Sequence, residues 1–177
     1  MVKHWTETDL VAALSDLKII ADSREQVNNH ITEYWDRKKV PYFTRKLDVG
    51  DYSAQLGDYT LEHDIAVERK HNIDEICGNL TQDRDRFERE FLRAKANGTK
   101  VFLMIEDAGW QDIYLHNYRS RLSPKSLMAS LMSWQVRFNI TVWFCEKENT
   151  ARLIHQILYY AAREELLNGG FYGYKAD

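Results

Sequence analysis

An acidic and a basic residue two positions apart, Glu68 and Lys70, end an apolar segment of the chain. In a β-strand such side chains share a face, so Glu68 and Lys70 would lie together while Val67 and Arg69 point the other way. If Asp51 comes from the neighbouring strand, it adds a second carboxylate to the same volume. Two carboxylates and a lysine can hold a hard divalent cation and position a water for metal-assisted phosphodiester hydrolysis.

An E-x-K triplet also occurs in ordinary surface strands, where it forms a solvent-facing salt bridge. The spacing alone favours that simpler interpretation. The surrounding sequence favours a site, because an apolar segment ends in Asp22-Ser23-Arg24-Glu25 upstream, and Asp74 follows Lys70 by four residues.

The chain resembles the XPF-type structure-specific endonuclease family at these positions. The nuclease domain of that family carries the motifs D-x-R-E, V-G-D-Y and E-R-K-x-x-x-D, which are found here at residues 22–25, 49–52 and 68–74. The likeness continues through an arginine-bearing segment at residues 85–87 and covers residues 18–168. One such motif would be weak, but three in family order are a strong signal.

The resemblance implies a restriction-endonuclease-like α/β/α sandwich with a central mixed sheet. It also implies a divalent-metal-dependent DNA endonuclease that uses Mg²⁺, with Mn²⁺ able to substitute, and acts on branched or flapped DNA. Asp51 and Glu68 would be the main metal ligands, and Asp22 and Glu25 would complete the acidic wall directly or through water. The implied catalytic set contains both main ligands and three further residues, Lys70, Arg69 and Asp74. Lys70 would position the attacking water, and Arg69 and Asp74 would brace the site.

Arginines downstream of the triplet are candidates for binding the DNA backbone. Arg86, Arg89 and Arg93 follow helical spacing and can share one helix face. Arg86 also falls on the family pattern, whereas Arg89 and Arg93 could equally belong to a solvated helix with i,i+4 ion pairs. Arg24 in the first motif completes the expected DNA-binding set. The net charge of −3 argues against a protein that coats nucleic acid non-specifically, but a nuclease need only be basic locally.

A length of 177 residues suits one domain. We expect a single nuclease domain over residues 1–177, with a helical extension (1–17), a nuclease core (18–168), a tail (169–177) and no helix-hairpin-helix domain. Periodicity and capping signals predict helices near residues 6–17, 27–38, 73–80, 82–97, 123–138 and 149–168. They predict strands near residues 18–22, 40–46, 49–56, 59–70, 100–105 and 140–145. Residues 106–122 are expected to be irregular.

Aromatic and basic residues alternate in that irregular stretch, which contains Trp110, Tyr114, Tyr118, Arg119 and Arg121. They could stack unpaired bases and contact phosphates, or the aromatics could complete the core. The apolar stripe of the last helix similarly leaves two interpretations, packing on the sheet or forming a homodimer.

The sequence gives no sign of export or membrane insertion. The apolar run at residues 101–105 is too short to span a bilayer, and Cys77 and Cys145 form neither a zinc motif nor a disulfide framework. We therefore expect an intracellular protein, cytoplasmic or nuclear, whose partners are DNA and either a second copy of the chain or another protein. A catalytically silent DNA-binding or scaffolding module of the same fold is the alternative. A paired-carboxylate glycosidase would leave Lys70 unexplained.

Overall fold

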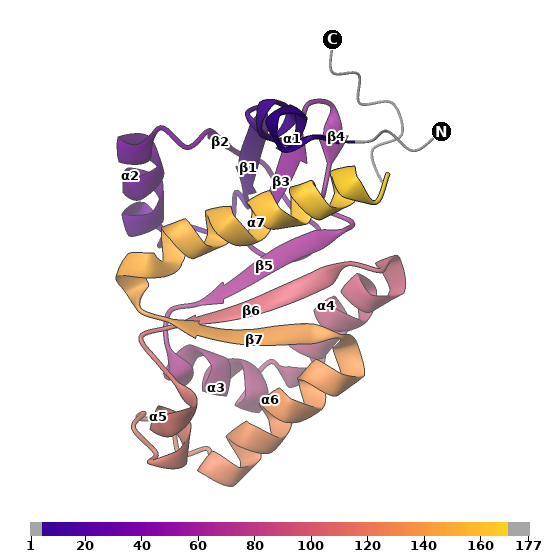
Figure 1. Ribbon diagram of the computed structural model, residues 1–177. Coiled ribbons are helices and arrows are strands. Elements are labelled where there is room, and N and C mark those ends of the chain that lie inside the picture. The colour runs from indigo at the N-terminus through magenta and orange to yellow at the C-terminus, as the bar shows by residue number, and fades with distance from the viewer. Residues whose placement is uncertain (1–4, 170–177) are drawn as a thin grey trace.

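A mixed seven-stranded sheet runs through the centre of the computed structural model, which describes residues 5–169 (Figure 1). The strands are β1 (Leu17–Ala21), β2 (Tyr42–Thr44), β3 (Tyr52–Leu56), β4 (Tyr59–Thr60), β5 (Ile65–Lys70), β6 (Lys100–Glu106) and β7 (Ile140–Cys145). Their order is β2-β1-β3-β5-β6-β7, with β4 paired to β3. The pairs β1–β3 and β3–β5 are antiparallel, whereas β1–β2, β5–β6 and β6–β7 are parallel.

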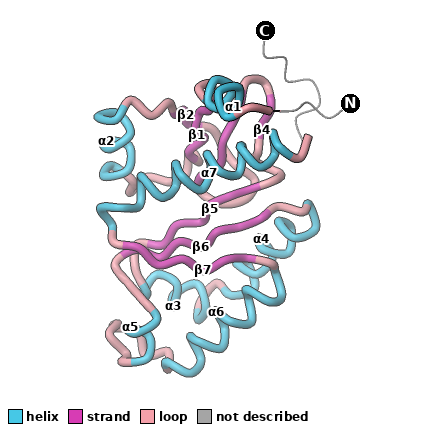
Figure 2. The backbone as a smooth tube through the Cα atoms, viewed as in Figure 1, coloured by secondary structure: helices cyan, strands magenta, loops and turns pink. Residues whose placement is uncertain are grey.

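Helices cover both faces of the sheet (Figures 1 and 2). One face packs against α1 (Glu7–Leu14), α2 (Asn29–Lys38) and α7 (Thr150–Leu167). The other packs against α3 (Ile73–Thr81), α4 (Arg84–Asn97) and α6 (Pro124–Phe138). A short helix α5 (Trp110–Tyr114) and a 3₁₀ turn η1 (Lys147–Asn149) lie in the connections. This architecture confirms the predicted α/β/α sandwich around a mixed sheet.

Capping signals in the sequence set several helix ends. The Thr6 side chain accepts a hydrogen bond from the Asp9 N–H and begins α1, and Ser123 followed by Pro124 begins α6. Asn72 caps α3 through the N–H of Glu75. Gly98 ends α4 in the left-handed region, with φ of 81°.

Three predicted elements were wrong in extent or type. The first helix ends at Leu14, and Leu17 already belongs to β1, where it pairs with Leu56. The long strand predicted over residues 59–70 is two strands, because the chain turns after β4 and the Ile65 N–H bonds back to the Leu61 carbonyl. The expected irregular stretch contains α5.

Parts of the predicted extension and tail, residues 1–4 and 170–177, lie outside the described residues. In the described part of the chain, no helix combines the length and apolar composition needed to cross a membrane.

Candidate active site

The junction of β3 and β5 brings Asp51 beside Glu68. Tyr52 pairs with Val67 across these strands, and the Asp51 N–H donates to the Val67 carbonyl at 2.8 Å. Asp51 Oδ2 accepts the backbone N–H of Arg69, also at 2.8 Å. The carboxylate is thus fixed at the strand end, on the neighbouring strand that the sequence argument required.

Gly50 permits this close approach of the two strands. Its φ is +72°, and a Cβ at this position would lie 3.0 Å from both the Ala66 Cβ and the Val67 carbonyl oxygen. Any other residue would strain the backbone and push β5 away from Asp51.

Glu68 and Lys70 project together from β5 toward α3 and α4. Lys70 Nζ lies 2.7 Å from Glu68 Oε1 and 4.9 Å from the centroid of the Phe87 ring on α4. The two charged side chains are only 9% and 11% exposed, so they do not form the solvent-facing salt bridge that the spacing alone favoured. The opposite faces predicted for Glu68 and Arg69 are confirmed, because the Arg69 side chain points toward the α2 side.

The charges of this cluster are incompletely balanced. Burial and the neighbouring Glu68 charge raise the pKa of Asp51 well above its ordinary value. Burial also raises the pKa of Glu68, although Lys70 counteracts part of this shift. Burial would lower the pKa of Lys70, but Glu68 and Asp51 together outweigh that effect and raise it, so Lys70 is an ammonium.

This arrangement fits a divalent cation. Two adjacent carboxylates whose pKa values are both raised lack positive charge, and carboxylate oxygens are preferred ligands of Mg²⁺ and Mn²⁺. Within residues 5–169, no three or more acidic, histidine or cysteine side chains are arranged to hold a metal ion by themselves. A cation held by Asp51 and Glu68 would therefore need further ligands from water or phosphate, as is common for Mg²⁺.

Asp22 lies beside Asp51, since its N–H donates to the Asp51 carbonyl oxygen at 2.7 Å. Both carboxylate oxygens of Asp22 are already bonded: Oδ1 accepts from Arg24 N and Nε, and Oδ2 accepts from Arg24 Nη2 and Leu47 N. Asp22 thus positions Arg24 in this structure. Its contribution to metal binding stays a prediction.

Arg69 anchors a buried network on the opposite face of the sheet. It donates through Nε and Nη2 to Glu106, each at 2.8 Å, and through Nη1 to Glu25 at 3.0 Å. His71 Nδ1 accepts from Arg69 at 2.6 Å, and His30 Nε2 lies 2.9 Å from Glu106. Glu25 is therefore held by Arg69 rather than beside Glu68, and its role as a metal ligand also stays a prediction.

Asp74 attaches another segment to the start of α3. It accepts hydrogen bonds from the N–H groups of Arg119 and Ser120, at 2.9 and 2.7 Å, and from Arg119 Nε at 3.1 Å. The structure therefore places Asp74 as a support for the segment between α5 and α6.

The predicted DNA-binding arginines are exposed. Arg86, Arg89 and Arg93 lie along α4, and none of them has an ion pair or a hydrogen bond from its side chain within the described part of the chain. The i,i+4 pair on this helix joins Arg84 to Glu88 instead. The Arg24 guanidinium is 62% exposed although it forms two bonds with Asp22.

Two acids near the site were missed by the sequence argument. Glu75 Oε1 lies 3.4 Å from Lys70 Nζ, and its Oε2 accepts the His71 N–H. Glu90, on α4, contributes to the raised pKa of Glu68. Glu75 occupies the third position after the cap of α3, where an acid is readily attributed to helix capping alone.

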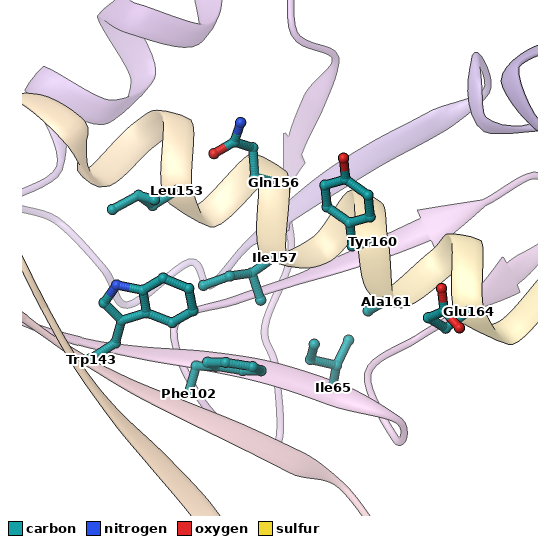
Figure 3. A pocket seen from close by; sticks show the side chains of 9 residues that line it. All are labelled: Ile65, Phe102, Trp143, Leu153, Gln156, Ile157, Tyr160, Ala161 and Glu164. Atoms are coloured by element: carbon teal, nitrogen blue, oxygen red, sulfur yellow. The ribbon is translucent and has the colours of Figure 1, made fainter.

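An apolar groove of about 540 Å³ lies on the other side of the sheet, between α7 and strands β5 to β7 (Figure 3). Phe102 and Trp143 line it from the sheet, and Ile157 and Tyr160 line it from α7. The groove belongs to the face opposite Glu68 and Lys70.

Comparison with known proteins identifies the family. The ERCC4 domain family matches residues 21–157. The fold is similar to XPF from Aeropyrum pernix, with a TM-score of 0.63 and 21% sequence identity over 84% of this chain and 66% of that chain. It is also similar to XPF from Aeropyrum pernix in a complex with DNA, with a TM-score of 0.61 and 20% identity over 83% and 66% of the two chains.

The chain thus spans 66% of the length of these two XPF structures. No curated protein sequence matches the chain. The family match extends from the last residue of β1 into α7 and includes the strand ends that carry Asp51, Glu68 and Lys70. The chain belongs to the ERCC4 domain family and has the fold of an XPF-type nuclease domain.

Proposed function

We propose that the protein is a divalent-metal-dependent DNA endonuclease that hydrolyses phosphodiester bonds in branched or flapped DNA. The observation that carries this proposal is the convergence of two carboxylates, the half-buried Asp51 and the buried Glu68, with the Lys70 ammonium at the ends of adjacent strands. Membership of the ERCC4 domain family supports nuclease activity. DNA as the substrate is supported by the similar XPF structure that contains DNA.

Asp51 and Glu68 would hold the cation, Mg²⁺ or Mn²⁺. When bound, the cation would polarise a phosphoryl oxygen and lower the pKa of a bound water. Lys70 is protonated in this environment, so it has hydrogen atoms to donate and no lone pair to accept a proton. Lys70 therefore orients the attacking water or stabilises negative charge on the phosphate, rather than acting as the general base.

The surrounding residues hold these groups and attract the DNA. The Arg69 N–H orients the Asp51 carboxylate, and Phe87 packs against the Lys70 ammonium. Arg24 and Arg86 present exposed guanidinium groups that can contact phosphate oxygens.

A catalytically silent DNA-binding module of the same fold is the rival function. A silent module would gain nothing from the buried Lys70 and its acidic partners Glu68 and Glu75. Burying charged side chains costs folding free energy, and clusters of this kind are found preferentially at functional sites. The chain retains Lys70 in contact with Glu68, and Asp51 at the end of the adjacent strand, and this favours an active enzyme.

The substrate test uses labelled flap, fork, four-way-junction and linear DNAs in Mg²⁺, in Mn²⁺ and in EDTA. We expect cleavage of the branched or flapped substrates in either metal and none in EDTA. Binding without cleavage in any metal would support the silent module. Equal cleavage of linear and branched DNA would refute the selectivity but leave the nuclease activity standing.

The site is tested by two variants with different expected losses. Lys70→Met keeps the apolar contact with Phe87 and should retain Mn²⁺ and DNA binding, while single-turnover cleavage falls by about 10²–10³-fold. Glu68→Gln should lose both Mn²⁺ affinity and cleavage. Lys18→Met, at an exposed lysine in β1, is the matched control and should be fully active. Full activity of both Lys70→Met and Glu68→Gln would refute this assignment of the active site.

A further inference from the structure

The end of α5 and the segment that connects it to α6 expose two large apolar side chains next to one another. Tyr114 is 66% exposed and Leu115 is 60% exposed. Neither belongs to the two core clusters of the described residues, whereas Ile113, one position earlier, is fully buried. The segment therefore does not use these two side chains for folding, and adjacent exposed apolar residues are characteristic of binding surfaces.

The same segment is held rigidly by its own hydrogen bonds. The Tyr118 hydroxyl donates to the Leu122 carbonyl at 2.8 Å, and His116 Nε2 lies 2.9 Å from the Ser120 carbonyl oxygen. The rings of His116 and Tyr118 stack at a centroid distance of 4.3 Å and an interplanar angle of 34°. A preorganised surface of this kind loses little conformational entropy when it binds a ligand.

Asp74 fixes the segment beside the candidate active site. Its carboxylate accepts hydrogen bonds from the backbone of Arg119 and Ser120, and it lies in the first turn of α3, directly after the strand that carries Lys70. Figure 1 shows α3 and α5 below the same end of the sheet, where β5 and β6 finish. A ligand on this segment would therefore lie close to the metal ligands.

The charge of the segment is positive. Arg119 is 89% exposed even though it pairs with Asp74. Arg121 and Lys125 are also exposed, and within residues 5–169 neither forms an ion pair. Exposed aromatic rings combined with unpaired cations are the features that bind single-stranded nucleic acid, since bases stack on rings and phosphates contact the cations.

We propose that residues 114–121, together with Lys125, form a platform that binds an unpaired DNA strand beside the cleavage site. Bases stack on the exposed rings of Tyr114 and His116, the latter backed by the half-buried Tyr118, while Arg121 and Lys125 contact the backbone. A paired duplex offers its phosphates but keeps its bases stacked on each other, so the platform distinguishes single strands from duplex. This inference rests on the proposed function in taking DNA as the ligand and adds how the enzyme recognises a flap.

The experiment measures binding of a fluorescent oligothymidine and of a blunt duplex, without metal, at several salt concentrations. Tyr114→Ala should weaken oligothymidine binding roughly 5- to 150-fold, the range expected for one lost base stack, with duplex affinity unchanged. Arg121→Ala should reduce the slope of log affinity against log salt for the single strand by about 0.7. Both side chains are exposed, and melting temperatures confirm that the variants fold.

Matched controls come from parts of the chain remote from α5. Tyr59→Ala removes a ring on β4 that is 36% exposed, and Arg152→Ala removes an exposed arginine on α7. Both controls should bind oligothymidine like the wild type.

Wild-type affinity of Tyr114→Ala for oligothymidine would overturn the platform, as would absence of single-strand binding by the wild type. Either result leaves the nuclease proposal standing if the wild type still cleaves DNA. Conversely, Tyr114-dependent strand binding by a protein that cleaves no DNA in Mg²⁺ or Mn²⁺ would support the platform and refute the nuclease. A loss of duplex and single-strand affinity in equal measure would also overturn it, because the platform requires unpaired bases.

Discussion

Replacing Glu106 by Gln should destabilise the fold strongly at neutral pH. Glu106 is 1% exposed and accepts two hydrogen bonds at 2.8 Å from the Arg69 guanidinium, while His30 lies 2.9 Å from it. The substitution keeps the shape of the side chain but removes the charge that balances Arg69. Among residues 5–169, it leaves the buried Arg69 cation with Glu25 as its one remaining ionic partner.

The magnitude follows from the pKa of Glu106. Burial alone would raise this pKa, but hydrogen bonds from Arg69, Thr150 and His30 outweigh burial and lower it from 4.5 to about 2. At 1.36 kcal/mol per pKa unit, this shift corresponds to about 3 kcal/mol of stability. Breaking a buried ion pair by removing one partner costs about 3–5 kcal/mol, which agrees in size.

The sign of the pH dependence is fixed by the lowered pKa. Because the folded-state pKa lies below the unfolded value, the stabilisation is fully present above pH 4.5 and is lost as the pH falls toward about 2. The difference in unfolding free energy between wild type and Glu106→Gln should therefore shrink through this window.

Urea unfolding at neutral pH and at a series of acidic pH values measures this difference. Glu7→Gln is the control, because Glu7 also pairs with an arginine, Arg163 at 2.7 Å, but its side chain is 77% exposed. Exposed pairs contribute at most about 1 kcal/mol, so the control should change little. A cost of Glu106→Gln no larger than that of the control, or one that did not shrink in acid, would refute the reasoning.

Three further outcomes are expected. Asp51→Asn should weaken Mn²⁺ binding measured by calorimetry and reduce cleavage. It should also raise the melting temperature without metal, because burial and Glu68 make ionised Asp51 costly in the fold. Unchanged Mn²⁺ affinity would rule out Asp51 as a ligand. Arg86→Ala should reduce the log–log salt slope of duplex binding by about one unit with Mn²⁺ affinity unchanged, and an unaltered slope would contradict a phosphate contact. Light scattering at tens of micromolar protein should give the mass of a homodimer formed through the groove beside α7. Because dimers dissociate on dilution, the measurement is made at this high concentration, and a single-chain mass there would exclude the dimer.

The arrangement on β5 was predictable because it depends only on local geometry. Alternation along a strand places Glu68 and Lys70 on one face and Arg69 on the other, whatever the rest of the fold does. The sandwich was predictable from the order of elements together with the three motifs. The position of Asp51 needed one assumption more, the pairing of β3 with β5, and the structure confirms it.

The partners of the outer acids could not be predicted, because they depend on which groups arrive from distant parts of the chain. Asp22 is bonded by the Leu47 N–H, and Glu25 is bonded by Arg69. Nothing in the first motif indicates that these donors would use the oxygens that the family resemblance assigns to metal. Residues His63-Asp64 are a turn or bulge signal in the predicted strand 59–70, and the structure has a turn there, which is closed by hydrogen bonds from the Asp64 and Ile65 N–H groups to the Leu61 carbonyl.

Arg69 connects the two faces of the sheet and explains how the proposed metal ligands can be held in place without a bound cation. Its N–H fixes the Asp51 carboxylate on one side, while its guanidinium is held by Glu106 and Glu25 on the other. Because buried charges are costly to separate, this network resists movement of the Arg69 backbone and so keeps Asp51 adjacent to Glu68 despite their mutual repulsion. The stability of the ion network on the α2 side is therefore a condition for the geometry of the site on the α4 side. The proposed cation would balance the charge of the carboxylates rather than assemble them.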